Sequence, residues 1–282
     1  MVNRPVSRAR WGLCWGTVPN ASATELIEAT AAVGGEVVAL STVFHADVLD
    51  DGGRALRTLC SSTGVRVEAI DPIIGGLPGV ADANEVPDHL AVHLQATTDR
   101  AIRMAEAVHA RSVNVAHFLG SPDTPVQRLI DSIGQIVDRA TRRSVEVTIE
   151  FIPNTGIPDL ATAMKIVEAI DVPELTVLLD VWHLARSGGT VEDVALLPPR
   201  SIGWIQLSDR VEPPPGTPYV PMSARMLPGD GDLPLDSILM AALTNSPGIA
   251  VCAEVFDPAN NERSNAEAAE LAATAMRQLG FR

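Results

Sequence analysis

The strongest constraint on the fold is a regular alternation of short apolar runs with longer amphipathic stretches. The apolar runs are rich in valine, isoleucine and leucine, which is typical of buried strands. Strands that alternate with helical stretches are typical of βα units and a parallel sheet. We therefore predict eight strands, at residues 10–18, 36–43, 65–74, 112–118, 145–151, 176–181, 201–207 and 249–255.

An amphipathic stretch follows each of these strands. We predict helices at residues 22–33, 47–62, 88–110, 125–143, 157–170, 191–196, 235–243 and 264–279. The strands are continuously apolar, as expected for a parallel sheet that is buried on both faces. Eight successive βα units close naturally into a barrel, so we predict an α/β fold, a single (β/α)8 TIM barrel domain over residues 1–282. An open doubly wound sheet is the alternative, but no glycine-rich phosphate loop follows the first strand.

The charge of the chain restricts its partners. Its 21 basic and 35 acidic side chains give a net charge of −14, which disfavours binding to nucleic acid and to anionic membranes. The three cysteines have no paired spacing, so we expect neither a disulfide framework nor a CxxC metal site. The sequence contains no signal-peptide pattern and no apolar stretch long enough to span a membrane. We predict a cytoplasmic protein that acts on a small molecule, and we leave open whether it forms a homo-oligomer.

Four oxygen-bearing side chains lie at the predicted carboxyl ends of four consecutive strands: Glu150, Asp180, Gln206 and Glu254. Catalytic groups of α/β barrels lie at this end of the strands. A carboxylate at the end of a buried strand is costly unless it is paired or bound to a metal. Three carboxylates and an amide therefore predict a divalent metal ion, with Mn²⁺ first and Mg²⁺, Co²⁺ or Zn²⁺ as alternatives. A satisfied polar cluster without a metal is the competing interpretation.

Two histidines are candidates for binding a substrate. His183 lies three residues after Asp180, which favours a role beside the metal ligand or at the substrate. His117 ends the fourth predicted strand and would point toward the same rim, although a structural role stays open. The other histidines fall in predicted loops or helices and are expected to be solvated: His45, His89, His93 and His109.

A long loop rich in proline and glycine follows the seventh predicted strand. Arg225 opens its run Arg-Met-Leu-Pro-Gly-Asp-Gly-Asp, in which the proline and glycines predict a defined turn. An arginine that reaches back over the barrel mouth would suit a substrate oxygen or carboxylate. We therefore predict that Arg225 binds substrate, and the alternative is an exposed loop arginine.

Five motifs together resemble the xylose isomerase-like barrel superfamily, and within it the sugar phosphate isomerase/epimerase group. They are IEF at Glu150, LLDVWH at Asp180, WIQLSD at Gln206, RMLPGDGDLP from Arg225 and AEV at Glu254. Each motif is short, but their order and strand placement together are specific, and the resemblance covers most of the chain.

This resemblance implies a metal held by Glu150, Asp180, Gln206 and Glu254. It also implies that the two glutamates exchange a proton with the carbon beside a polarised carbonyl. His183 and Arg225 would then hold substrate oxygens. The implied activity is that of a metal-dependent isomerase or epimerase of a small polyhydroxy carbonyl compound.

One motif departs from the pattern. Most sugar epimerases of this group have a histidine where this chain has Gln206, whereas the 3-dehydroshikimate dehydratases of the same superfamily look similar and use glutamine. A lyase reaction is therefore the alternative activity, and a barrel that binds a ligand without turnover is the third. The superfamily also has an AP endonuclease branch with a richer histidine set. Six histidines and a net charge of −14 argue against that branch.

Overall fold

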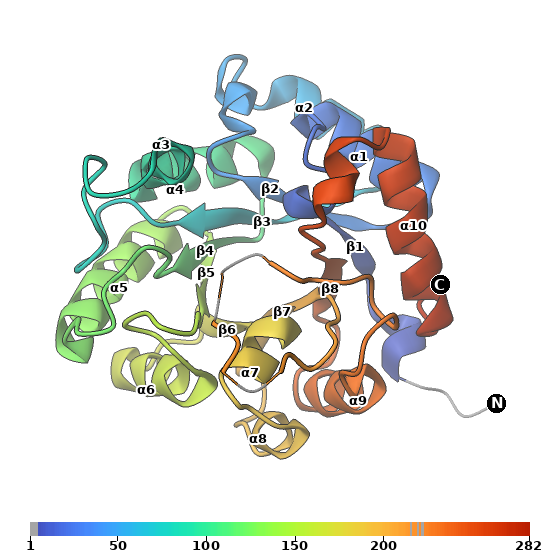
Figure 1. Cartoon of the computed structure of the whole chain (residues 1–282). Helices are drawn as coiled ribbons and strands as arrows, with labels where there is room; N and C mark the ends of the chain where they lie inside the picture. The colour runs from blue at the N-terminus through green and yellow to red at the C-terminus, as the bar shows by residue number, and fades with distance from the viewer. Residues whose placement is uncertain (1–4, 215, 219, 221–222) are drawn as a thin grey trace. The chain divides into compact units, whose positions relative to one another are not determined.

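The computed structural model describes residues 5–214, 216–218, 220 and 223–282. Eight parallel strands close into a barrel in the order of the chain (Figure 1). They are β1 Trp11–Cys14, β2 Val37–Ser41, β3 Arg66–Ile73, β4 Ser112–Ala116, β5 Glu146–Glu150, β6 Leu175–Asp180, β7 Ile202–Leu207 and β8 Ala250–Ala253. The predicted fold class, an α/β TIM barrel, is confirmed.

Helices connect the strands. The α-helices are α1 Ala23–Ala32, α2 Arg54–Thr63, α3 Asp88–Ala91, α4 Thr98–Val108, α5 Val126–Thr141, α6 Leu160–Ile170, α7 Val181–Arg186, α8 Val191–Ala195, α9 Leu235–Asn245 and α10 Asn265–Gln278. Short 3-10 helices are η1 Pro5–Arg8, η2 Trp15–Thr17, η3 Ala46–Leu49, η4 Val92–Gln95 and η5 Pro258–Asn261. Within the described part of the chain, none of these helices has the length and apolarity needed to cross a membrane.

Side chains that precede the helices set where several of them begin. The Ser22 hydroxyl accepts a hydrogen bond from the Glu25 amide, and the Glu25 carboxylate accepts one from the Ser22 amide. This reciprocal cap satisfies two amides that the first helical turn leaves open, and such caps stabilise a helix by about 1 kcal/mol. The same arrangement starts α8 at Thr190 and α10 at Ser264.

Two predicted helices are divided in the structure. The helix predicted at 47–62 is interrupted by Gly52 and Gly53, whose φ angles of 66° and 73° lie outside the helical region. The helix predicted at 88–110 is interrupted before α4, where the Thr97 hydroxyl accepts from the Arg100 amide and begins a new helix. The amphipathic pattern from which both helices were predicted does not by itself locate such a break.

The segment after β6 differs most from the prediction. Residues 181–186 form α7, a helix that was not predicted, so two helices separate β6 from β7. Asp180 ends β6 and also caps α7, because its Oδ1 accepts from the amides of Trp182 and His183. His183 therefore lies on a helix rather than at the end of a strand. The first strand is likewise shorter than predicted, since the chain turns into η2 after Cys14.

The chain divides into two compact units. Unit 1 consists of Met1–Ala39, Leu59–Arg66 and Leu179–Arg282. Within it, β1 pairs with the start of β2 on one side and with β8 on the other, and β8 pairs with β7. Helix α10, drawn in red, packs against α1 and β1 (Figure 1). The core of unit 1 includes the buried rings of Trp11 and Trp204.

Unit 2 consists of Leu40–Thr58 and Val67–Leu178. Its strands β3, β4, β5 and β6 form a continuous parallel ladder, in which Glu150 at the end of β5 lies opposite Leu178 of β6. Helix α5 packs against β5 and α6, and α4 packs against β4. The side chains of Val113, Val147 and Val177 on these strands are fully buried.

Candidate functional site

In unit 1, three predicted ligand residues lie at the carboxyl ends of β6, β7 and β8. Asp180 is the last residue of β6, Gln206 is the penultimate residue of β7, and Glu254 follows β8 directly. Their exposed fractions are 0%, 1% and 3%, so all three polar side chains are buried. Gln206 Nε2 donates to Glu254 Oε1 at 2.8 Å. The structure thus brings Gln206 and Glu254 together.

Arg225 reaches into the same cluster. Its Nη2 lies 2.7 Å from Asp180 Oδ2, and its Nη1 lies 3.4 Å from Glu254 Oε2. The side chain is 1% exposed, so the interpretation of Arg225 as an exposed loop residue is wrong. Buried carboxylates are stable only when they are paired, and the guanidinium pairs with two of them here. Sequence analysis placed Arg225 over the barrel mouth but did not foresee this pairing.

Aromatic rings and His183 surround the Arg225 guanidinium. The ring centroids of Trp182 and Phe256 lie 5.1 and 5.5 Å from its central carbon, within the range of cation–π attraction. His183 Nε2 lies 3.4 Å from Arg225 Nη2 and 3.6 Å from Asp180 Oδ2. His183 is therefore next to the proposed metal ligand Asp180, as its spacing in the sequence suggested.

Asp180 is held in its ionised form. Burial by itself would raise the pKa of this carboxyl, but the charge of Arg225 and the neighbouring His183 outweigh that effect and lower the pKa below its usual value. Hydrogen bonds to the charged form act in the same direction, and Asp180 accepts from Arg225 and from the His183 amide. A buried anion of this kind can bind either a cationic side chain or a metal ion.

Asp209 organises the loop that carries Arg225. Its Oδ1 accepts from the amides of Arg210 and Leu233 at 2.8 and 3.1 Å, and its Oδ2 accepts from the Gly229 amide at 3.0 Å. Asp209 and Met226 also exchange two backbone hydrogen bonds of 2.8 and 2.9 Å. Because Met226 follows Arg225, these bonds fix the backbone from which Arg225 extends.

Close packing around Asp209 explains one glycine of the loop. A Cβ atom at Gly231 would lie 2.4 Å from Asp209 Oδ1 and 2.4 Å from the Arg210 carbonyl, which no side chain tolerates. Sequence analysis gave Asp209, the last residue of the WIQLSD run, no role. The signal was the aspartate of the QLSD run combined with the PGDG turn, since a carboxylate accepts several amides of a tight turn.

In unit 2, Glu150 ends β5 and takes part in a buried polar network. Asn114 Nδ2 donates to Glu150 Oε2 at 2.9 Å and to Asp71 Oδ1 at 2.7 Å, while Thr148 Oγ1 donates to Asn114 Oδ1 at 3.1 Å. One amide therefore bridges two buried carboxylates. Sequence analysis did not single out Asp71 or Asn114. Both could have been noticed as polar residues inside apolar strands, because burying a polar side chain without a hydrogen-bond partner costs free energy.

The predicted substrate-binding His117 is engaged by the protein backbone. Its Nδ1 accepts from the Gly156 amide at 2.9 Å, and its Nε2 donates to the Pro78 carbonyl at 2.7 Å. Burial lowers the pKa of its imidazole, although the bond to Pro78 acts against this effect. These bonds tie together loops of unit 2, so we do not include His117 in the function proposed below.

Two histidines that were expected to be solvated are not. His45 is 2% exposed, and its Nδ1 accepts from the Ser41 amide. His93 is partly buried, with its ring edge-on to Phe44 and Phe118 at centroid distances of 5.8 Å. Burial, assisted by the charge of His89, lowers the pKa of His93. The expectation of solvent exposure holds only for His89 and His109.

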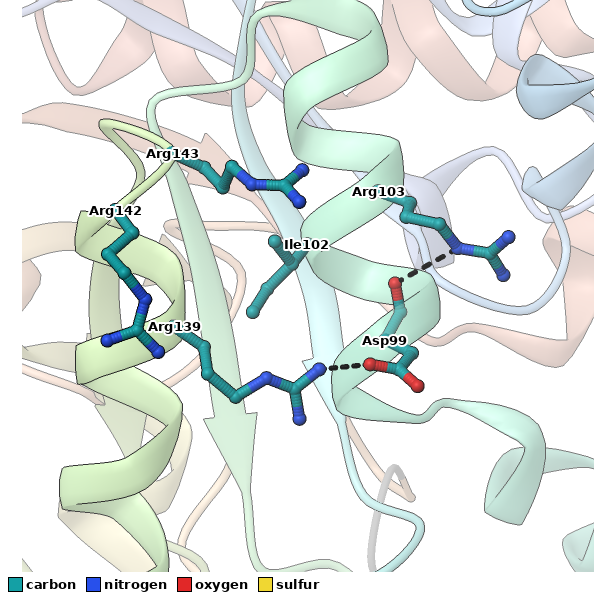
Figure 2. A pocket seen from close by; sticks show the side chains of 6 residues that line it. All are labelled: Asp99, Ile102, Arg103, Arg139, Arg142 and Arg143. Atoms are coloured by element: carbon teal, nitrogen blue, oxygen red, sulfur yellow. Dashed lines mark hydrogen bonds and ion pairs between the residues drawn. The ribbon is translucent and has the colours of Figure 1, made fainter.

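A separate groove of about 880 Å³ lies in unit 2 between α4 and α5 (Figure 2). Arg139 pairs with Asp99 across it, and all its arginines are exposed. Exposed charges of this kind are screened by water and salt, so we assign no site to the groove. Its lining residues are Asp99, Ile102, Arg103, Arg139, Arg142 and Arg143.

The fold and the buried acidic cluster define a TIM barrel whose polar side chains gather at the carboxyl ends of its strands. The family model of the xylose isomerase-like TIM barrel matches residues 27–279. The chain therefore belongs to the xylose isomerase-like TIM barrel family.

One curated relative and two solved structures illustrate what the chain is similar to. It is 24% identical to an inosose isomerase of Halalkalibacterium halodurans over 174 residues, which is 58% of this chain and 61%, less than two thirds, of that relative. It shares the fold of the IolI protein with a bound zinc atom, with a TM-score of 0.81, 16% identity and coverage of 96% and 97%. It also shares the fold of AsbF, a probable 3-DHS dehydratase from Bacillus anthracis, with a TM-score of 0.72, 16% identity and coverage of 97% and 99%.

Proposed function

We propose that this protein is a divalent-metal-dependent isomerase or epimerase that acts on a small polyhydroxy carbonyl compound. The observation that carries the proposal is the buried cluster of Asp180, Gln206 and Glu254 at the carboxyl ends of adjacent strands. Membership of the xylose isomerase-like family supports it, as does the likeness to an inosose isomerase.

The proposed metal ligands are Glu150, Asp180, Gln206 and Glu254. Strand register within unit 1 supports part of this set. Gln206 of β7 lies opposite Cys252 of β8, and Glu254 is two residues further along, so the side chains of Gln206 and Glu254 leave the same face. Asp180 ends β6 in the same unit, and Glu150 ends β5 in unit 2.

The residues present fit a divalent cation. Asp180 and Glu254 already converge on a positive group, the guanidinium of Arg225, and the neutral amide of Gln206 donates a hydrogen bond to Glu254. Glu150, Asp180 and His183 are buried side chains of the kinds that ligate divalent metals. An oxygen-rich set suits Mn²⁺ or Mg²⁺, and an added imidazole suits Zn²⁺. When bound, the metal would supply Lewis-acid polarisation of a substrate carbonyl.

In this proposal Glu150 and Glu254 move the proton. A carboxylate on each side of the carbon beside the carbonyl can remove a proton from one face and return it to the same or the other face. Both side chains are buried, with exposed fractions of 7% and 3%, and burial excludes bulk water from such a transfer. Arg225 and His183 would hold substrate oxygens.

A dehydratase reaction is the second candidate, and Gln206 is the residue that favours it. The dehydratases of the superfamily carry glutamine at this position, and the fold of a probable 3-DHS dehydratase is similar to that of this chain. Such a reaction also begins with removal of a proton beside a carbonyl and then expels a hydroxyl group. It would use Glu150 or Glu254 as the base without the return of the proton.

Deuterium exchange tests the proposal. The purified protein is incubated with Mn²⁺ in D₂O with a panel of ketoses and inososes, and with 3-dehydroshikimate in a separate arm monitored by ultraviolet absorbance. We expect deuterium at the carbon beside the carbonyl of at least one sugar, and loss of this exchange in Glu150→Gln. Formation of an aromatic product in the separate arm would favour the dehydratase. No reaction in either arm would favour a barrel that binds without turnover.

A further inference from the structure

We propose that Arg225 is a built-in competitor of the metal: its guanidinium neutralises Asp180 and Glu254, and it must release Asp180 before a divalent cation binds with full strength. The inference rests on the proposed function, because it concerns the same metal site. It adds that Arg225 and the metal compete for Asp180, and that the metal binds before the substrate.

The contacts of Arg225 are those of a counter-ion. Its Nη2 bonds to Asp180 Oδ2 at 2.7 Å, and its Nη1 lies 3.4 Å from Glu254 Oε2. All three side chains are at most 3% exposed, so water screens their charges little. A divalent ion that shares Asp180 and Glu254 would lie within a few ångströms of the guanidinium and would be repelled by it.

The surroundings of Arg225 offer the guanidinium a second position. The ring centroids of Trp182 and Phe256 lie 5.1 and 5.5 Å from its central carbon, and Ser208 Oγ lies 3.3 Å from Nη1. The side chain can therefore leave Asp180 by rotation about its own bonds while it stays stacked on an aromatic face. The backbone need not move, because the bonds between Asp209 and Met226 hold it.

Binding order follows from this arrangement. A guanidinium that is paired with Asp180 has fewer N–H groups for a substrate oxygen. Once a metal takes over the Asp180 carboxylate, these N–H groups become available, and arginine binds oxygen anions and carbonyl oxygens well. Metal should therefore bind first and raise the affinity for substrate, with Arg225 as the residue that couples the two events.

Metal affinity of Arg225 variants tests the inference. Mn²⁺ is titrated into chelator-treated wild type, Arg225→Gln and Arg225→Lys, and the dissociation constant is measured by electron paramagnetic resonance of free Mn²⁺. We expect R225Q to bind Mn²⁺ at least tenfold more tightly than wild type, and R225K to stay within about threefold of it because the charge is kept. The matched control is Arg263→Gln, which breaks another arginine–aspartate pair of unit 1 and should leave the Mn²⁺ affinity unchanged.

A second measurement covers the case in which R225Q does not fold without metal. Wild type, Arg225→Met and R225K are then purified with Mn²⁺, and the rate at which EDTA strips the metal is recorded. R225M should lose Mn²⁺ at least tenfold more slowly than wild type, and R225K at the wild-type rate. Equal or weaker binding by the neutral variants, beside a wild type that binds Mn²⁺, overturns this inference alone. Absence of Mn²⁺ binding by every variant overturns the proposed function as well.

Discussion

The amide of Gln206 donates from Nε2 to Oε1 of Glu254 at 2.8 Å, across the paired strands β7 and β8. This bond sets the orientation of the amide, because its nitrogen is bound to the Glu254 carboxylate. In the proposed function, the amide oxygen would be a metal ligand while the nitrogen keeps Glu254 in place. The bond thus gives a physical reason why a glutamine could act as a metal ligand at a position where the sugar epimerases that this chain resembles mostly have a histidine.

Replacement of the Gln206 amide by a carboxylate tests this role. Gln206→Glu places a second negative charge beside Glu254, and we expect it to lower the free energy of unfolding in EDTA by about 1–3 kcal/mol. Mn²⁺ should raise the melting temperature of Q206E more than that of wild type, since the added carboxylate needs a cation. Gln206→His, which keeps a neutral ligand, is the control and should show the smaller effect. Equal response of Q206E and wild type to Mn²⁺ would contradict this role.

The bridge from Asn114 to two buried carboxylates predicts a stability effect in unit 2. Asn114→Leu removes the donor shared by Asp71 and Glu150, and hydrogen bonds to charged groups contribute about 1.5–3 kcal/mol each. We expect N114L to lose at least about 2 kcal/mol in urea unfolding. Thr148→Val, which removes only the hydroxyl that binds Asn114, should lose about 1 kcal/mol or less. A loss for N114L no greater than that of T148V would argue against the bridge.

Asp209 should matter for activity, although none of its hydrogen bonds described above is to one of the four proposed metal ligands. Asp209→Asn loses one of the acceptors that hold the amides of Gly229 and Leu233, so Arg225 would be held less firmly. We expect a stability loss of about 1–3 kcal/mol and a higher substrate KM at saturating Mn²⁺. Asp232→Asn alters an exposed aspartate of the same loop that accepts one amide, and it should behave like wild type in both assays.

His117 predicts how stability changes with pH. Its pKa in the folded protein lies below the ordinary value of 6.5 because the ring is buried, so the unfolded chain takes up a proton that the folded chain does not. The stability contributed by neutral His117 is therefore present above about pH 6.5 and is lost as the pH falls through the lower folded pKa. His117→Gln should be less stable near pH 8 and should show a shallower decline toward pH 5. His89→Gln alters an exposed histidine and should keep the wild-type profile, and an unchanged slope in H117Q would refute the prediction.

The features that depend on local sequence pattern, the strands and the polar residues at their ends, were predicted from the sequence. The eight strands were found because continuous apolar runs mark strands that are buried on both faces. Asp180 and Gln206 lie within those strands, and Glu254 follows one directly, so their common end of the barrel could be predicted. The missed helix α7 has a local cause. Asp180 serves both as a strand residue and as a helix cap, and the apolar run across it resembled the continuation of a strand.

Contacts between side chains that lie far apart in the sequence could not be predicted from local pattern. Arg225 lies 45 residues from Asp180, and nothing local distinguishes an arginine that pairs with a buried carboxylate from one that points to solvent. The same holds for Asn114, which is 43 residues from Asp71 and 36 from Glu150. The expected exposure of His45 and His93 was wrong for a related reason: whether a histidine is buried depends on loops that pack over it from other parts of the chain.

The most direct test of the central claim is the stoichiometry and affinity of Mn²⁺ binding. Chelator-treated wild type is titrated with Mn²⁺ beside four single variants of the proposed ligands: Glu150→Gln, Asp180→Asn, Gln206→Leu and Glu254→Gln. The account predicts one Mn²⁺ per chain in wild type and at least tenfold weaker binding in each variant. Wild-type affinity in all four variants, or no binding by wild type, would contradict it.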